Sequence, residues 1–571
     1  MNLMIRYIKR HIGMFAAAVF FLTVETLAEL LQPAFMANIV DIGVAGKDIG
    51  QIQKYGAVML AIAVVGAAGA IIRSILASMT SQLIGMELRG DIYRKVQSLS
   101  LENIDKLKPA DIITRITNDV TQIINFVQGT MRIMLKAPII CIGATALLII
   151  QTPRELPAIA VIIVISTILI IANMKLGYPR YGELQSRLDK LNNVSREFLR
   201  SIRVVKAFNA EEIEGEKFHA AALDLANAGT SAARVLAVFG PLIHLVVNFG
   251  IVLLLWRSRA QNAGEIGRLM ASLNYMTHIL FSLAFVSNIL NSAVRAVSSS
   301  GRIQEIFDET PAQEAPSPAV TADISGTVEF GNVTFAYSEA ARPAIEHLSF
   351  RIKSGETVGI IGSTGSGKST LVSLVPRLYD ASAGQVLVGG LDVKSICPEV
   401  LRKHIAIVPQ KSLLFSGTIA QNLRFGNEDA SEDEVLSASK TACAHDFVSA
   451  LADGYETVLG QEGVNLSGGQ KQRLCIARAF IAKPKILILD DCTSALDAIT
   501  ESALLHGLRR DTEGVTVLLI SQRISAVMRC DRILCMKDGK MEGYGTHNEL
   551  MMDCGHYRAI YESQIGCDAN A

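Results

Sequence analysis

Gly362-Ser-Thr-Gly-Ser-Gly-Lys-Ser369 is the stretch that decides how the rest of this chain is interpreted. It follows an apolar run at 357–361 that predicts a strand, and Thr370 lies at the predicted start of a helix. Glycines in such a turn let backbone N–H groups point at phosphate oxygens, and the helix N-terminus adds partial positive charge. We therefore expect a phosphate-binding loop in which Lys368 reaches the β- and γ-phosphates and Ser369 holds Mg²⁺. A glycine-rich linker would not keep this spacing after a buried strand.

Composition narrows the classes of protein that fit. The chain has 571 residues, enough for several domains, and half of them are hydrophobic. Its formal net charge is zero, which argues against nucleic-acid binding driven by basic charge. Its nine cysteines form no C-x-x-C pair, so we predict neither a zinc nor a redox site, and the odd count fits reduced cytosolic thiols. No cleavable signal peptide is evident.

The hydrophobic residues are concentrated in the first half of the chain. Residues 2–11 predict a short interfacial helix that is apolar on one side and cationic on the other. Lysine and arginine crowd two long connections at 79–128 and 176–233, so we expect these loops and both termini on the cytoplasmic side. Six apolar stretches are each long enough to span a membrane: roughly 13–36, 55–78, 129–150, 156–175, 234–256 and 266–294.

The long connections are polar and helical in pattern, so we expect them to extend the membrane helices into the cytosol and to turn there. The expected turning points are 117–119 and 207–211. A piece rich in proline, alanine and glutamate at 309–324 then breaks the periodicity and predicts a linker.

Beyond the linker the pattern becomes α/β. The first strands are expected at 327–335, 348–352 and 357–361, and helices alternate with strands to about residue 565. The predicted fold class is therefore an α-helical six-span membrane domain followed by an α/β P-loop domain. The predicted boundaries are 1–308 for the membrane domain, 309–326 for the linker and 327–571 for the α/β domain.

Two polar side chains near the phosphate loop suit nucleotide chemistry. Tyr337 precedes the loop by 25 residues and could stack on adenine, although a lone tyrosine is more often ordinary strand packing. Gln410 follows a strand expected at 405–408, which would place its amide where it could contact Mg²⁺ or the attacking water.

Three motifs complete the pattern. Residues 466–470, Leu-Ser-Gly-Gly-Gln, open a helix expected at 471–482, and the N–H groups at its start would bind a second phosphate. The buried strand expected at 486–490 ends in Asp490, a carboxylate suited to Mg²⁺. Residues 494–497, Ser-Ala-Leu-Asp, follow it.

In this order the motifs resemble those of an ATP-binding cassette (ABC) domain, and with six spans ahead of it essentially the whole chain resembles a half-transporter of the ABC exporter fold. The corresponding family motifs are Walker A at 362–369, the Q-loop at Gln410, the signature at 466–470, Walker B at 486–490 and the D-loop at 494–497. The resemblance implies ATP and Mg²⁺ as cofactors. It also implies two paired chains that sandwich two ATP molecules, each between one chain's Walker motifs and the other's signature. The long loops would carry coupling helices that press on the cassettes.

The resemblance assigns roles residue by residue. The residues assigned to ATP are Tyr337, Gly362, Ser363, Thr364, Gly365, Ser366, Gly367, Lys368, Ser369, Thr370, Leu466, Ser467, Gly468, Gly469, Gln470 and Asp497. Those assigned to Mg²⁺ are Ser369, Gln410 and Asp490, and those assigned to catalysis are Gln410, Asp491 and Gln522.

Two of these positions depart from the family pattern. The family has a glutamate after Walker B and a histidine after the next strand, where this chain has Asp491 and Gln522. Aspartate is one methylene shorter; misplacing a reacting group can cost about a hundredfold in rate, and losing a general base about 10²–10⁴. Glutamine can bond a γ-phosphate but cannot carry charge or shuttle a proton. We predict a site that binds ATP well and hydrolyses it slowly.

The intact signature bears on the partner chain, because in the family it completes the partner's ATP site. Beside Asp491 and Gln522 it favours a different partner that supplies glutamate and histidine, as in the degenerate-site half of a heterodimeric multidrug-type exporter. We expect export of small amphipathic or hydrophobic, drug- or lipid-like compounds across the cytoplasmic membrane. The alternatives are a homodimer with two slow sites, an importer (for example of siderophore type) on the exporter fold, and a non-transporting regulatory membrane protein. Six spans exclude a soluble ABC ATPase.

Polar residues also occur within the predicted spans. Glu25 and Glu29 share a helix face and could contact cationic substrates or make interhelical hydrogen bonds, with neither favoured by the sequence. Two further pairs four residues apart, for which helix packing is the simpler interpretation, are His244 with Asn248 and Asn274 with His278.

Overall fold

The computed structural model of the chain describes residues 2–151, 156–257, 266–313, 324–338, 342–494, 496–511 and 513–566. The chain divides into two compact units. The first, called the helical unit below, comprises Met1–Gln97 and Pro109–Glu309, and the second, called the α/β unit, comprises Ser98–Lys108 and Thr310–Ala571. The predicted linker at 309–324 lies largely outside the described residues.

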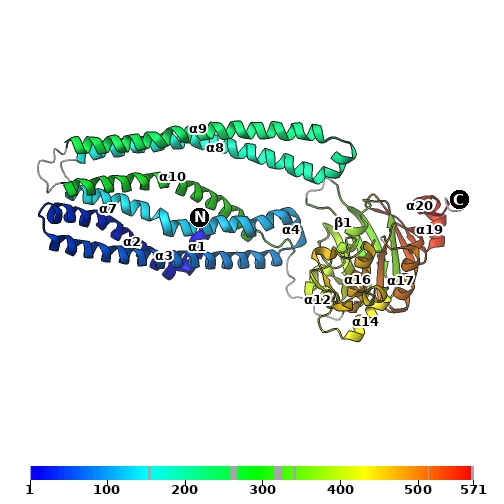
Figure 1. Ribbon diagram of the computed structural model, residues 1–571. Helices are drawn as coiled ribbons and strands as arrows, with labels where there is room; N and C mark the ends of the chain where they lie inside the picture. Colours follow the sequence, from blue (N-terminus) through cyan, green and yellow to red (C-terminus); the bar gives the residue numbers. More distant parts are fainter. Residues whose placement is uncertain are drawn as a thin grey trace. The chain divides into compact units, whose positions relative to one another are not determined.

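Long helices build the helical unit, and α8 and α9 lie side by side along most of their length (Figure 1). Its elements are α1 (Asn2–Arg10), α2 (Ile12–Asn38), the π-helical η1 (Ile39–Val44), α3 (Ile49–Ser98), α5 (Pro109–Thr114), the π-helical η2 (Arg115–Asp119), α6 (Val120–Gly129), the π-helical η3 (Thr130–Met134), α7 (Lys136–Gln151), α8 (Leu156–Ala207), α9 (Glu211–Arg257) and α10 (Ile266–Asp308).

The six predicted spans all fall in helical segments. Five helices of the described chain are long and apolar enough to cross a membrane: Ile12–Val44, Ile49–Ser98, Pro109–Ile150, Ala160–Ala207 and Glu211–Leu253. The sixth predicted span, 266–294, lies in α10, a helix of 43 residues. The prediction of a multi-pass helical membrane domain is thus supported by the helices themselves.

One of the two predicted turning points is wrong. Residues 117–119 lie inside the continuous helical run from α5 through η2 to α6. Their polarity serves packing instead, because the fully buried Asp119 accepts hydrogen bonds from Ser299 Oγ (2.9 Å) and Arg302 Nε (2.8 Å) on α10. The other turning point, 207–211, is confirmed: α8 ends at Ala207, Asn209 has φ +50°, and α9 begins at Glu211.

Close contacts fix the first helices of this unit. The short helix α1 buries Leu3, Met4 and Tyr7, and the Tyr7 hydroxyl donates to Asp91 Oδ2 at 2.6 Å. Small residues let α2 and α3 approach, because a Cβ added at Gly66 would lie 2.7 Å from the Cβ of Ala28.

Two main sheets organise the α/β unit. An antiparallel sheet has the order β2-β1-β4-β5, and a six-stranded sheet has the order β12-β11-β3-β10-β9-β6, parallel except for β12. The strands are β1 (Val328–Phe335), β2 (Ile345–Ile352), β3 (Thr357–Gly362), β4 (Ala383–Val388), β5 (Leu391–Asp392), β6 (Ile405–Val408), β7 (Gly417–Thr418), β8 (Val458–Leu459), β9 (Ile486–Asp490), β10 (Thr516–Ile520), β11 (Arg532–Lys537) and β12 (Lys540–Gly545). The strands expected at 327–335, 348–352 and 357–361 are confirmed, with β2 beginning three residues earlier than predicted.

The α/β unit also contains short helices, most of which lie between its strands. They are α4 (Leu101–Leu107), α11 (Lys368–Leu374), α12 (Pro398–Lys403), α13 (Ile419–Arg424), α14 (Glu432–Thr441), α15 (His445–Ser449), α16 (Gly468–Ile481), α17 (Ala498–Asp511), α18 (Ile524–Val527), α19 (His547–Asp553) and α20 (Gly555–Ile565), with 3₁₀ turns η6 (Val393–Ser395), η7 (Gly454–Glu456) and η8 (Gln461–Gly463). Strands β3, β9 and β10 are continuous apolar runs, as expected for parallel strands that are buried on both faces. Their carboxyl ends meet at one edge, which is where the predicted site residues lie.

Candidate functional site: an ATP site at the carboxyl edge of the parallel sheet

The phosphate loop has the geometry that its sequence predicts. Strand β3 ends at Gly362 and α11 begins at Lys368, so the glycines between them form the strand-to-helix turn. Gly365 and Gly367 have φ of +82° and +93°, which side chains rarely adopt. At Gly367 an added Cβ would also lie 2.5 Å from the carbonyl oxygen of Ala344. The glycines are therefore required by this turn, which leaves the N–H groups at the start of α11 available to an anion.

Lys368 is folded back on its own loop. Its Nζ donates to the carbonyl oxygens of Gly362 (2.9 Å) and Ser363 (2.7 Å) and to Ser366 Oγ (3.3 Å). Burial lowers the pKa of Lys368, while the nearby carboxylates of Asp490 and Asp491 act in the opposite direction. A buried ammonium that is held only by neutral oxygens is suited to receive a phosphate, since a bond to an anionic oxygen is stronger than a bond to a neutral one.

Two of the predicted Mg²⁺ residues meet directly. Ser369 Oγ on α11 donates to Asp490 Oδ1 at the end of β9 (3.0 Å). Burial raises the pKa of Asp490, and the charge of Asp491 raises it further, against the effects of Ser369 and Lys368. Hydroxyl and carboxylate oxygens are ligands that Mg²⁺ prefers, so this pair fits the ion that accompanies ATP.

The three predicted catalytic residues also converge. Gln410 Nε2 and Gln522 Nε2 both donate to Asp491 Oδ2, at 3.3 and 3.1 Å. Gln410 follows β6, Asp491 follows β9 and Gln522 follows β10, so the parallel sheet brings the three together from distant parts of the chain. Of the predicted Mg²⁺ residues, Gln410 is thus hydrogen-bonded to the Asp491 carboxylate, whereas Ser369 is hydrogen-bonded to that of Asp490.

The signature stretch begins α16 as a capping box. Ser467 Oγ accepts from the N–H of Gln470 (3.3 Å), and Gln470 Oε1 accepts from the N–H of Ser467 (2.9 Å). Leu466 is buried beneath them, while Ser467 and Gly468 are exposed. This arrangement leaves the exposed start of a 14-residue helix facing outward, as a phosphate from another chain would require.

Tyr337 lies in a cluster of aromatic rings beside α11. It packs edge-on against Phe335 (4.9 Å between centroids) and Tyr379 (5.4 Å), and its hydroxyl shares a 3.1 Å hydrogen bond with Thr370 Oγ1. The ring keeps 37% of its surface exposed, so one side is free for another ring. Stacking on adenine stays a prediction.

The two residues of the next contact were not singled out from the sequence, although the resemblance implies that the long loops press on the cassettes. The Tyr379 hydroxyl donates to Asp105 Oδ2 of α4 at 2.6 Å, and burial together with Asp105 raises the pKa of Tyr379. Asn103 of α4 also bonds the backbone of Thr310 (3.0 Å) and Ala312 (2.9 Å). The segment of the first long loop at Ser98–Lys108 therefore belongs to the α/β unit, in line with the coupling contact that the resemblance implies.

Asp497 of the D-loop caps a helix. Its carboxylate accepts from the N–H (2.9 Å) and the hydroxyl (2.8 Å) of Thr500 at the start of α17, and these bonds lower its pKa. Ser494 Oγ donates to the carbonyl oxygen of Asp491 (3.0 Å), so the D-loop is tied to the catalytic position.

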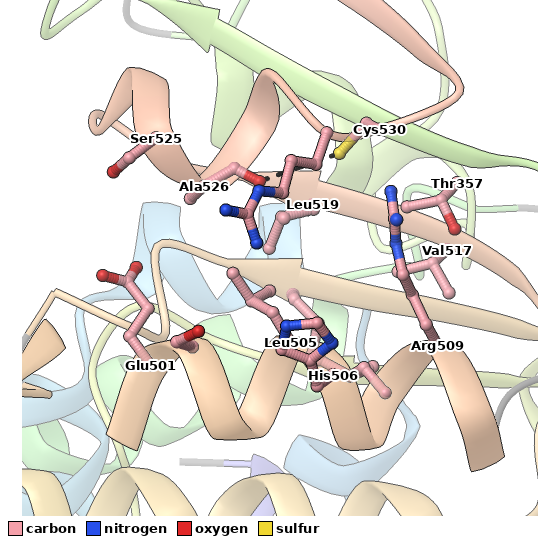
Figure 2. A pocket seen from close by; sticks show the side chains of 14 residues that line it. Thr357, Glu501, Leu505, His506, Arg509, Val517, Leu519, Ser525, Ala526 and Cys530 are labelled. Carbon is pink, nitrogen blue, oxygen red and sulfur yellow. Dashed lines mark hydrogen bonds between the residues drawn. The ribbon is translucent and has the colours of Figure 1, made fainter. Parts of the chain in front are cut away.

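A separate cavity of about 220 Å³ lies between α17 and the strands β9 and β10. Figure 2 shows Leu505, His506 and Arg509 of α17 on one side and Leu519 and Ala526 on the other. Of its described lining residues only Leu489 lies within a motif, Walker B, and none is a residue assigned above to ATP, Mg²⁺ or catalysis. We therefore place the nucleotide at the phosphate loop and not in this cavity.

Comparison with known proteins tests the resemblance. The model of the ABC transporter transmembrane region matches residues 15–283, and the ABC transporter model matches residues 345–494. Over 552 residues the chain is 38% identical to the uncharacterized ABC transporter ATP-binding protein YfiB of Bacillus subtilis, with 96% of each covered. It is 31% identical over 567 residues to the multidrug resistance-like ATP-binding protein MdlA of Escherichia coli, covering 98% of this chain and 95% of the relative.

A solved structure agrees on the fold. The bacterial Atm1-family ABC exporter with ATP bound superimposes with a TM-score of 0.79 at 24% identity, over 98% of this chain and 99% of that chain. The predicted fold class is thereby confirmed, and ABC domains of this kind bind ATP, generally with Mg²⁺, for coupled transport. The chain belongs to the ABC transporter family, as a half-transporter of exporter type in which one transmembrane region is followed by one ATP-binding domain.

Proposed function

We propose that this chain is one subunit of a heterodimeric ABC exporter and that its own ATP site binds nucleotide but hydrolyses it slowly. The observation that carries the proposal is the pair of glutamine amides on Asp491 Oδ2, at 3.1 and 3.3 Å. The two amides fill the lone pairs of Oδ2, so this oxygen is not free to accept a proton from the attacking water. Gln522 can neither carry charge nor shuttle a proton in support of this base.

The residues that the binding of ATP and Mg²⁺ requires, in contrast, are present. Lys368 and Asp490 are buried at the carboxyl edge of the sheet, and Ser369 is exposed beside them; together they would hold the phosphates and Mg²⁺. The exposed start of α16 would complete the site of a partner chain that supplies glutamate and histidine. The proposed boundaries are those of the sequence prediction, with the membrane domain at 1–308 and the ATP-binding domain at 327–571.

The proposed location is the cytoplasmic membrane, with the N-terminus and the ATP-binding domain in the cytoplasm, because lysine and arginine crowd the long loops. The proposed substrates are small amphipathic or hydrophobic compounds. The name of the relative MdlA, a multidrug resistance-like protein, supports this class.

The decisive experiment compares ATP hydrolysis by this chain purified alone with hydrolysis by the chain copurified with the half-transporter that associates with it. We expect near-zero activity alone and strong activity in the pair, with unhydrolysed ATP recovered from this chain's site after turnover. Brisk hydrolysis by the chain alone would favour the homodimer. Transport direction is read from inverted membrane vesicles, where ATP-dependent uptake indicates export and ATP-dependent release indicates import.

A further inference from the structure

A polar cavity of about 490 Å³ lies inside the helical unit, where the sequence analysis left the role of two glutamates open. Its size is in the range of small-molecule sites. Charged side chains on four helical segments line it: Glu25 and Glu29 of α2, Arg73 of α3, Arg132 of η3 and Lys136 of α7. Ile140 of α7 and Phe281 of α10 add apolar surface.

The two glutamates are already paired. Glu25 accepts from Arg73 Nε at 2.5 Å and from Lys136 Nζ at 2.8 Å, and Glu29 accepts from Lys136 Nζ at 2.7 Å. Interhelical pairing, one of the two interpretations of these residues, is what the structure contains. A cationic ligand would have to displace an internal cation from each carboxylate.

The cationic side chains, in contrast, retain donors that no described carboxylate accepts from. Arg73 is only 8% exposed, yet its Nη1 has no hydrogen-bond partner among the described residues. An unpaired buried donor loses its hydration without compensation, and a charged one loses more, so a partner is expected for it. Within the described chain Arg132 makes no ion pair, and three cations face two carboxylates across the cavity. The only other titratable lining residue described is His278.

The local backbone structure also indicates a functional site at this cavity. Arg132 lies in the π-helical η3, which interrupts the helical run ahead of α7. Such π-turns are rare and frequently occur at functional sites. Charged residues within membrane helices commonly face a cavity and mark a substrate path.

We propose that this cavity binds the anionic group of an amphipathic ligand, a carboxylate or a phosphate, with Arg73 and Arg132 as its partners and with the apolar wall around Ile140 and Phe281 holding the adjoining hydrocarbon. The planar guanidinium groups suit either oxyanion. The inference rests on the proposed transport function only in treating the ligand as a substrate. Its chemistry is common to an exported organic anion and to an anionic membrane lipid.

The test measures equilibrium binding without ATP, so that it does not depend on whether the chain transports. The full chain in phosphatidylcholine nanodiscs is titrated with three radiolabelled probes of equal chain length: decanoate, decanol and decyltrimethylammonium. Empty nanodiscs correct for partitioning into the bilayer. We expect saturable binding of decanoate at least tenfold tighter than that of either other probe, because a charge-assisted hydrogen bond is worth tenfold or more in affinity. Equal binding of decanol, or tighter binding of the cation, overturns the proposal.

Variants connect the binding to the two arginines. Arg132→Gln, at an exposed side chain, should weaken decanoate binding at least tenfold, whereas Arg268→Gln, at an exposed arginine of α10 outside the cavity, should not change it. Because Arg73→Gln alone would leave Glu25 short of a partner, the double variant Glu25→Gln with Arg73→Gln tests that position. Unchanged affinity in both cavity variants overturns the assignment.

Lipid competition identifies the source of the anion. Nanodiscs that contain phosphatidylglycerol are expected to reduce decanoate binding if a lipid headgroup occupies the same site, and to leave it unchanged if the site takes only smaller anions. Either result supports the anionic site. Transport and ATPase assays of the same preparations then report separately on the proposed function.

Discussion

Restoring the family residues, by Asp491→Glu together with Gln522→His, should raise ATP hydrolysis at this chain's own site. One added methylene would move the carboxylate forward by about 1.5 Å, one carbon–carbon bond. A misplacement of that size costs about a hundredfold, and a general base contributes about 10²–10⁴. In the unmodified chain the Asp491 carboxylate accepts hydrogen bonds from two glutamine amides, at 3.1 and 3.3 Å. We therefore expect the double variant to hydrolyse ATP about a hundredfold faster.

The assay must isolate this site from that of the partner. The chain is copurified with its associated half-transporter, in which the phosphate-loop lysine is replaced by alanine, and single-turnover hydrolysis of labelled ATP is followed. Asp491→Asn should change the unmodified rate by less than about twofold, because a residue that is not a working base contributes little to lose. Asp453→Glu, at an exposed carboxylate far along the chain, controls for the added methylene. No gain in the double variant, or a large loss in Asp491→Asn, would refute the reasoning.

Three further outcomes follow from buried charges. Lys368→Ala should weaken ATP binding by about a hundredfold, as measured with a fluorescent ATP analogue, because Nζ is the cation of the phosphate loop; retained affinity would place the phosphates elsewhere. Burial raises the pKa of Asp490 above its ordinary value of about 4, so the nucleotide-free protein should lose stability as pH rises from about 4 through that raised pKa. In thermal unfolding at pH 5 and pH 8, Asp490→Asn should reduce this dependence, and an unchanged slope would contradict the cause given. Asp119→Asn should destabilise the helical unit by roughly 2–3 kcal/mol, since its bonds to Ser299 and Arg302 weaken; thermal unfolding in detergent measures this, and the exposed Asp111→Asn should have no effect.

The ATP site was largely predictable because parallel strands make sequence order informative. A motif that directly follows a parallel strand lies at the carboxyl edge of the sheet, and the phosphate loop, Asp490, Asp491 and Gln522 all stand in this position. The geometry agrees, as Ser369 bonds Asp490 and Gln522 bonds Asp491. The sequence motifs and the order of the parallel strands therefore indicate the same position for the site.

The helical unit was less predictable, because a span reveals its length but not which residue faces which neighbour. Glu25 bonds Arg73, 48 residues away, and Lys136, 111 residues away, and no spacing rule relates them. The turn predicted at 117–119 was wrong for the same reason. A short polar stretch predicts a turn, whereas here Asp119 is fully buried against α10. The role of a polar residue in a long helix depends on the residues that it contacts, and only the packed structure shows these contacts.

The two departures from the family pattern also form one structural unit, which is why they are best changed together. Asp491 Oδ2 receives the Gln522 amide directly, so a longer carboxylate at 491 would extend into the space that this amide now occupies. A histidine alone at 522 would face a carboxylate that is still too short to reach the water beyond it. Residues in contact are not expected to act additively. The aspartate and the glutamine therefore act as one bonded pair, which supports the proposed role of this site in holding ATP.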